Sequence, residues 1–343
     1  MILSLLITFL SFAAYAIEPM EYIKKPDIKT DTQVIGDKIF FRFGFKDLQG
    51  AYQEWSWSDD LQSLLGGAKS FGINVKDPSK MEFYNSELPG AMFKNHPQIG
   101  VIPDYSKLVS YYYTSVTPLY KQWKQYVVNN NLGQRQSVEL LLRFFQDFPY
   151  GVPPDVIDNK FISGLFVPPL SLQNGWADCD SKSLLMATVL AHDESFRDKM
   201  AMILVPGHAF LGFEFMPQVY DEKYKYQNRT FIVAEPTGLS RTPFGRKNSP
   251  YTRLIGVEPI VVEPPIATSY NEEVAPIGLA PLVESDCPDN GLLIDIFSDY
   301  ENARIQQCVI KVNGEYVKHG PLLKYGTDGK PLSKTIYNKG VAL

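Results

Sequence analysis

Three residues between positions 179 and 235 have side chains suited to nucleophilic catalysis, and each stands at the edge of a predicted element. Cys179 begins a predicted helix, His208 opens a predicted strand, and Glu235 follows the end of another strand. Because the N-terminus of a helix favours a negative charge, we expect a lowered pKa for the Cys179 thiol. A histidine on a rigid strand can take the thiol proton and return it to a leaving group, while a carboxylate orients the imidazole. The sequence therefore predicts a thiol-dependent acyl-transfer site.

Each of these residues also has a purely structural interpretation. A cysteine before an apolar helix is often a small buried side chain, His208 could be an ordinary core or loop histidine, and Glu235 could be a turn residue. Two neighbours are further candidates for the site. Gln173, six positions before Cys179, is a candidate oxyanion donor, and Trp176 is a candidate lining residue, although both also suit a structural role. The backbone N–H of Cys179 is the safer oxyanion donor.

The elements that must position these side chains are a helix and three strands. Residues 180–191 have apolar positions at helical spacing, with Asp178 as the predicted N-cap. Three β runs follow at 200–205, 209–215 and 230–234. A helix followed by neighbouring β runs predicts an α+β fold, in which the helix bearing the cysteine packs on a sheet bearing the histidine and the carboxylate.

Two more helices are predicted before this group. Residues 104–129 have helical periodicity that Pro118 should kink or break, and residues 136–148 have a strong apolar stripe that ends at a proline-rich run. Both helices have the pattern of core elements. Residues 17–103 mix strand-like runs, such as the aromatic segment 38–45, with turn signals and suggest no chemistry.

Three short motifs together resemble those of the transglutaminase-like superfamily, whose fold is papain-like. NGWADCDSKSLL at 174–185 is similar to the cysteine motif, GHAFLG at 207–212 to the histidine motif, and IVAEPT at 232–237 to the third motif, which usually has Asp where this chain has Glu235. The resemblance covers about residues 134–240 and suggests an exported, bacterial-type member. It implies a Cys179–His208–Glu235 triad on a helix and an antiparallel sheet.

The resemblance implies that Cys179 attacks a peptide or glutamine amide of a protein or peptide substrate and forms a thioester. Hydrolysis of the thioester would make the protein a peptidase or amidase, which we favour because water is always present. Transfer to an amine would make it a protein-glutamine transglutaminase. A third possibility is an exported binding or assembly protein that keeps the fold without catalysis. None of these needs a metal or an organic cofactor.

The composition excludes several other classes of protein. The 343 residues carry 33 Lys and Arg against 38 Asp and Glu, a net charge of −5, so we expect no nucleic-acid partner. The four histidines are scattered and there are only three cysteines, which argues against a zinc site.

The N-terminal segment predicts the compartment. Residues 1–16 are apolar and uncharged and end in Ala14-Tyr15-Ala16, which is typical of a signal peptide cleavage site. The run is shorter than the roughly 20 residues of a spanning helix, so we expect a periplasmic or secreted protein that is not an integral membrane protein after cleavage. In an oxidising compartment Cys287 and Cys308 are expected to form a disulfide, the alternative being two buried free thiols, and Cys179 remains as the unpaired cysteine.

These observations divide the chain into five expected parts. A hairpin signal at Asn313-Gly314 indicates β structure near the C-terminus. The parts are a signal peptide (1–16), an N-terminal accessory region (17–103), a transglutaminase-like catalytic core (104–257), a proline-rich linker (258–281) and a C-terminal β-rich extension (282–343).

Overall fold

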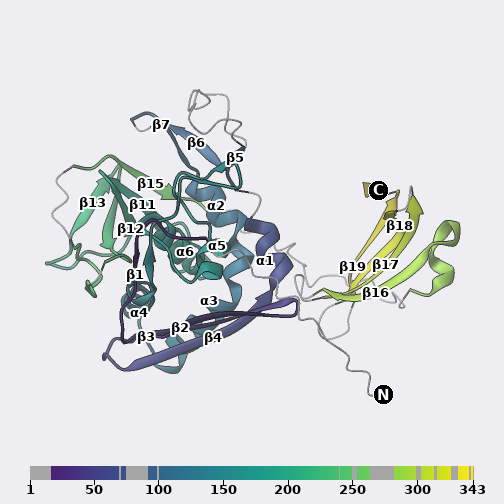
Figure 1. Ribbon diagram of the computed structural model, residues 1–343, viewed down its shortest axis with the longest axis horizontal. Helices are drawn as coiled ribbons and strands as arrows, with labels where there is room; N and C mark the ends of the chain where they lie inside the picture. Colours follow the sequence, from purple (N-terminus) through teal and green to yellow (C-terminus); the bar gives the residue numbers. More distant parts are fainter. Residues whose placement is uncertain are drawn as a thin grey trace, which may run out of the picture. The chain divides into compact units, whose positions relative to one another are not determined.

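A computed structural model of the chain has two compact units, with the boundary between residues 265 and 266 (Figure 1). It describes residues 17–68, 71–74, 92–98, 100–238, 240–248, 253–262, 282–298, 303–312, 315–325, 331–339 and 341–342. The expected signal peptide and most of the expected proline-rich linker lie outside these residues. The described parts are mixed α+β with antiparallel sheets, which confirms the predicted fold class at that level.

The first unit is built around a five-stranded antiparallel sheet in the order β13-β14-β12-β11-β15. The strands are β11 (Met200–Val205), β12 (His208–Phe213), β13 (Lys223–Tyr226), β14 (Arg229–Ala234) and β15 (Gly256–Ile260). All of β11 and most of β12 are buried because apolar clusters cover both faces of the sheet. Between these two strands Gly207 has a φ of +68°, a conformation that glycine adopts without strain, and the tight turn places His208 at the start of β12.

Helix α6 (Cys179–Leu190) lies against β12 at the centre of the unit. Its residues from Ser181 to Leu190 are all buried, since other helices surround the sides of α6 that do not face the sheet. These are α2 (Tyr105–Tyr111), the 3-10 helix η3 (Tyr113–Val116), α3 (Thr117–Asn129), α4 (Gln134–Asp147) and α5 (Pro168–Asn174). The helical stretch predicted at 104–129 is thus broken, with Pro118 in the first turn of α3, where a missing N–H is tolerated.

The N-terminal residues belong to the same hydrophobic core as the helices. A three-stranded sheet of β2 (Thr30–Ile35), β3 (Lys38–Lys46) and β4 (Tyr52–Asp60) packs on α4. Phe45, Trp55 and Phe144 meet there with ring centroids 4.6 to 5.5 Å apart. The expected accessory region and catalytic core therefore share one interior, and β15 continues the sheet to Ile260, beyond the boundary expected at 257.

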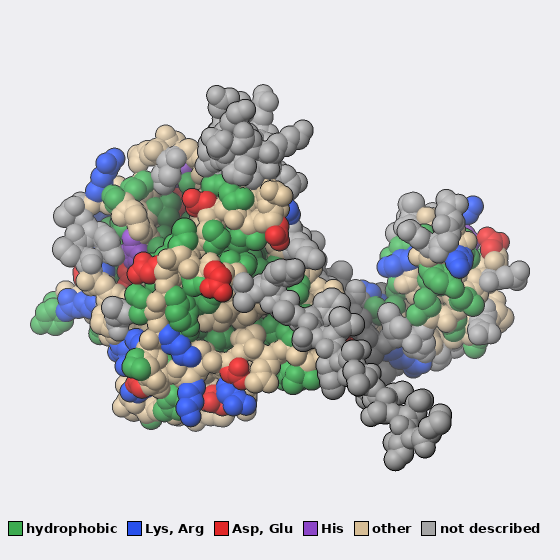
Figure 2. Space-filling view, in the orientation of Figure 1, with side chains coloured by type: hydrophobic (Ala, Val, Ile, Leu, Met, Phe, Trp, Pro, Cys, Tyr) green, Lys and Arg blue, Asp and Glu red, His purple; other side chains and the backbone are tan. Residues whose placement is uncertain are grey.

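Shorter elements complete the first unit. α1 (Leu61–Ala68) follows β4. The remaining strands form three small sheets. β1 (Tyr22–Ile23) pairs with β8 (Tyr150–Gly151), and β6 (Phe93–His96) pairs with β7 (Gly100–Pro103). In the third sheet β10 (Lys160–Phe161) lies between β5 (Ile73–Asn74) and β9 (Val156–Ile157). On the face shown in Figure 2, Lys and Arg side chains of this unit are interspersed with acidic and apolar ones.

The second unit is an antiparallel meander of five strands. After the short 3-10 helices η4 (Glu284–Asp286) and η5 (Pro288–Asn290) come β16 (Leu292–Ser298), β17 (Ala303–Val312), β18 (Glu315–Tyr325), β19 (Pro331–Asn338) and β20 (Val341–Ala342). β17 and β18 are antiparallel neighbours with Val312 opposite Glu315, and the predicted turn residues Asn313 and Gly314 lie outside the described residues. The predicted disulfide is confirmed, since Cys287 and Cys308 are bonded across 21 positions. No helix among the described residues has both the length and the apolarity needed to cross a bilayer.

Candidate active site

Cys179 is the first residue of α6 and is half-buried. Gly175 ends α5 with a φ of +69°, and the chain then turns through Asp178, whose extended backbone and side chain form the predicted N-cap. The carboxylate of Asp178 accepts the N–H of Ser181 at 3.3 Å. The Cys179 thiol accepts a hydrogen bond from the backbone N–H of Ala209, so it lies beside the first residues of β12.

His208 and Glu235 are brought together by strand pairing. β12 and β14 are antiparallel, with Leu211 opposite Ala234, so the start of one strand meets the end of the other. His208 Nε2 lies 2.8 Å from Glu235 Oε2. Glu235 is fully buried, and its second oxygen, Oε1, accepts the N–H of Thr237 at 3.2 Å. Two hydrogen bonds therefore hold the carboxylate in one orientation toward the imidazole.

The other carboxylates near this part of the chain have different partners. Asp221 is paired with Arg135, and Glu214 lies 2.9 Å from Arg229. Glu235 is thus the carboxylate that the structure places on His208.

The pKa of the Cys179 thiol is raised, whereas its place at a helix N-terminus predicted a lowered pKa. Burial is the largest cause of a pKa raised well above the usual value for a thiol, and the nearby Asp180, Asp178 and Glu235 raise it further. The hydrogen bond from Ala209 opposes this effect. The prediction of a lowered pKa is therefore wrong, because desolvation and three acidic neighbours outweigh the positive end of the helix dipole. The resting thiol is protonated at neutral pH.

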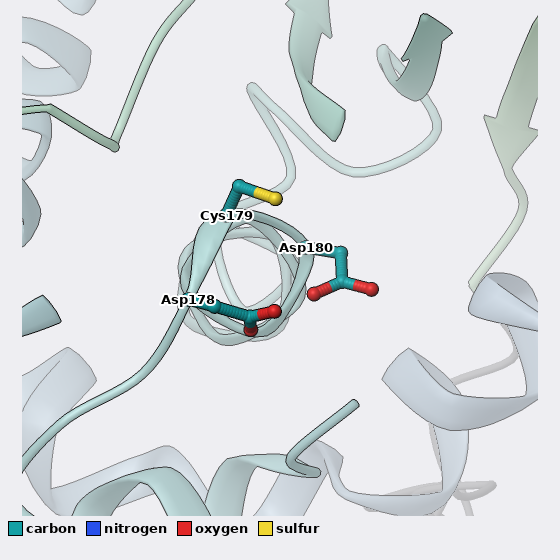
Figure 3. A group of neighbouring side chains, drawn as sticks. All are labelled: Asp178, Cys179 and Asp180. Atoms are coloured by element: carbon teal, nitrogen blue, oxygen red, sulfur yellow. The ribbon is translucent and has the colours of Figure 1, made fainter. Parts of the chain in front are cut away.

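Asp178 and Asp180 form a hydrogen-bonded acid pair next to the thiol. Figure 3 shows both side chains and that of Cys179 at the start of α6, with Asp178 immediately before the helix. Burial raises the pKa of both carboxyls, and that of Asp180 most, because it also faces the charge of Asp178. Asp178 caps the helix as well, since it accepts the N–H of Ser181. The ligand atoms of these three residues lie within 4.8 Å of one another, but Asp178 caps the helix and is hydrogen-bonded to Asp180, and we assign no metal to them.

A cavity of about 260 Å³ opens beside the His208–Glu235 pair. It is lined by Glu21, Ile23, Tyr150, His208, Glu235, Thr237, Gly238 and Asn248. Tyr150 is one of these lining residues, and burial raises the pKa of its hydroxyl. Sequence reasoning did not single out Tyr150, Glu21 or Ile23, because they stand far from the motifs along the chain and have no spacing that marks them.

The two neighbouring candidates are placed differently from the triad residues. Trp176 is 5% exposed and packs on Phe166, with ring centroids 4.6 Å apart, and over Gly151. It is a core side chain. Gln173 is half-buried on α5. Neither is among the described residues that line the cavity.

Polar side chains on α4 and α6 anchor the walls of the site. Gln146 donates to the carbonyl of Glu235 at 2.8 Å and so fixes its backbone. Asp147 is buried and pairs with Lys25 and Arg241, at 2.8 and 2.9 Å. Lys182, one turn after Cys179, is buried and donates to two carbonyls at the end of α4, and burial lowers its pKa to about 7.

Comparison with known proteins found no family model, no curated protein and no solved structure that matches this chain.

Proposed function

We propose that this protein is an exported, transglutaminase-like cysteine peptidase or amidase that cleaves peptide or glutamine amides through a thioester on Cys179. The proposal rests on the placement of three side chains. The thiol accepts the N–H of Ala209, and the adjacent His208 is held at 2.8 Å by a fully buried carboxylate, Glu235. Nucleophile, base and orienting acid in this order are what thiol-dependent acyl chemistry requires. The Cys287–Cys308 disulfide is compatible with export.

In the proposed reaction, Glu235 keeps the ring proton of His208 on Nε2, so Nδ1 is the nitrogen that accepts the thiol proton. The sulfur then attacks the amide carbonyl, and the backbone N–H of Cys179 at the helix start stabilises the developing oxyanion. Collapse breaks the C–N bond, His208 donates the proton to the departing amine, and a thioester remains. Water, deprotonated by His208, attacks the thioester and releases the carboxylic acid and the free thiol.

The raised pKa of Cys179 determines how the thiol is activated. Because the resting thiol is protonated, removal of its proton must accompany attack on a bound substrate, as general-base catalysis. We favour water over an amine as the acceptor because water needs no binding site. Transfer to an amine uses the same thioester and differs only in the acceptor.

The burial of Cys179 also supports a second candidate function, which is non-catalytic. A half-buried, protonated thiol beside an acid pair also suits a non-catalytic protein that keeps the fold for binding or assembly. The two functions differ in the reactivity of Cys179, which can be measured directly.

The test is the rate of iodoacetamide labelling of Cys179 against pH, with the disulfide left intact so that one thiol is available. If His208 is the base, His208→Ala should lower the rate near neutral pH by about a hundredfold, the lower end of what general-base assistance contributes. His319→Ala is the matched control, since His319 also binds a carboxylate, Asp289 at 3.0 Å, in the second unit. Equal rates in wild type and His208→Ala would overturn the catalytic proposal in favour of the non-catalytic one.

A second measurement separates hydrolysis from transfer. Glutamine-containing peptides are incubated with the protein, with and without hydroxylamine, and the products are identified by mass. Hydrolysis gives a free acid or a cleaved peptide, whereas transfer gives a hydroxamate only when hydroxylamine is present. Both products should disappear in Cys179→Ala.

A further inference from the structure

The first residues that the structure describes run as a short strand along one edge of β8. β1 pairs with β8 in antiparallel register. Two further main-chain bonds extend the ladder, since the N–H of Met20 donates to the carbonyl of Val152 at 2.9 Å and the N–H of Val152 donates to the carbonyl of Glu21 at 3.0 Å. We call residues 17–23 the N-terminal strap. It covers the outer edge of the segment 150–152.

The opposite edge of the same segment faces the loop that carries the nucleophile. Gly151 N–H donates to the carbonyl of Ala177 at 3.3 Å, and Ala177 N–H donates to the carbonyl of Pro149 at 3.2 Å. Ala177 precedes Cys179 by two residues. Residues 150–152 thus lie between the strap and the cysteine loop, and a chain on their outer edge is about two strand spacings, roughly 9.5 Å, away from that loop.

Side chains of the strap alternate between the cavity and solvent. Glu21 and Ile23 line the cavity together with His208 and Glu235. Met20 and Tyr22 point away and are 66% and 50% exposed. Main-chain pairing along an edge, with alternate side chains entering a pocket, is how an extended peptide is bound by strand addition.

Side-chain contacts anchor the strap at its two ends, whereas main-chain hydrogen bonds hold the part between them. At one end the N–H of Ile17 donates to Asn174 Oδ1 at 3.0 Å. Past the other end Lys25 pairs with the buried Asp147 at 2.8 Å, and Ile28 is 2% exposed. Between these points the strap buries little apolar surface, so local opening should cost far less than unfolding of the unit.

We propose that the outer edge of residues 150–152 is the peptide-binding edge of the site, and that the N-terminal strap occupies it until an extended polypeptide displaces the strap. The ligand class is an extended, unfolded segment of polypeptide, bound mainly through its backbone, with one or two side chains entering the cavity beside His208. Calling this ligand the substrate rests on the proposed function. The binding edge itself does not, because it is defined by main-chain hydrogen bonds.

The test uses the full chain with Cys179→Ala, so that binding is measured without chemistry, and a fluorescein-labelled peptide with the sequence of residues 17–25, IEPMEYIKK, which contains the strap. Met20→Pro removes an N–H that holds the strap and leaves the edge intact, whereas Met20→Ala keeps that N–H. Loss of one backbone hydrogen bond from the competing strap should raise the affinity for the peptide about three- to tenfold in Met20→Pro and leave it unchanged in Met20→Ala. Val152→Pro removes the donor of the edge and should weaken peptide binding relative to Val152→Ala.

Hydrogen exchange gives a readout that does not depend on the peptide. The amides of Met20 and Val152 should exchange faster than those of β11 and β12, and in Met20→Pro the amide of Val152 should exchange faster still. Equal peptide affinity in Met20→Pro and Met20→Ala, with unchanged exchange at Val152, would overturn the proposal. Peptide binding without any product from the active protein would contradict the proposed function alone. Product formation with a KM unaffected by Met20→Pro would contradict the binding edge alone.

Discussion

Replacing Glu235 with Gln should change which nitrogen of His208 carries the proton. Thr237 N–H donates to Oε1, so the oxygen of the new amide must take that position and its NH₂ group must face His208 Nε2. An NH₂ group at this position requires Nε2 to be an acceptor, which moves the ring proton to Nδ1. The nitrogen that should receive the thiol proton is then already protonated. A wrong tautomer of this kind costs up to about 10⁴ in rate, and we expect at least a hundredfold loss in Glu235→Gln.

Glu235→Asp tests the same contact through distance. Shortening the side chain by one methylene withdraws the carboxylate by about 1.5 Å, which is enough to break a 2.8 Å hydrogen bond. We expect a loss of reactivity in this variant too, although the histidine tautomer is no longer forced to the wrong form.

The assay is the pH dependence of iodoacetamide labelling of Cys179, together with thermal unfolding to show that each variant is folded. Glu214→Gln is the matched control, since Glu214 is a partly exposed carboxylate paired with Arg229 and should not affect the thiol. Unchanged labelling in both Glu235 variants, with the fold intact, would refute the assignment of Glu235 as the orienting residue.

Three further predictions concern stability. Asp147→Ala should lower the free energy of unfolding, measured by chemical denaturation, by about 3 kcal/mol. This is the lower end of the cost of breaking a buried ion pair, because the two cations that Asp147 leaves behind reach solvent. Replacing Cys287 and Cys308 with Ser should cost about 3 kcal/mol by loop entropy without altering the labelling rate of Cys179. Burial lowers the pKa of Lys182 from 10.5 to about 7 in the folded state. Between these two pH values Lys182 is protonated in the unfolded chain and neutral in the folded one, so the free energy of unfolding rises with pH, by up to about 1.4 kcal/mol per pH unit. In Lys182→Met that rise should be absent from unfolding curves measured from pH 7 to 10.

Local patterns were sufficient to predict most of the elements around the site. The helix expected at 180–191 is Cys179–Leu190, and the strands expected at 200–205 and 230–234 are Met200–Val205 and Arg229–Ala234. These agree because an apolar periodicity, a capping aspartate and a glycine turn act over a few residues, which is the range that a sequence pattern describes. Local patterns do not show how far the hydrophobic core extends along the chain. Nothing local in residues 17–103 shows that their aromatic side chains share an interior with α4.

The sequence by itself determined that a thiol begins a helix, that a histidine begins a strand, and that Cys287 and Cys308 could be bridged. Only the tertiary structure shows how Glu235 reaches His208, because the register of β12 on β14 joins residues 27 positions apart. The tertiary structure also decided that the pKa of Cys179 is raised and not lowered. Desolvation depends on what packs around a side chain, and the sequence does not state this. The strap on residues 150–152 is the most distant case, since no pattern in residues 17–23 identifies a partner strand more than 120 positions away.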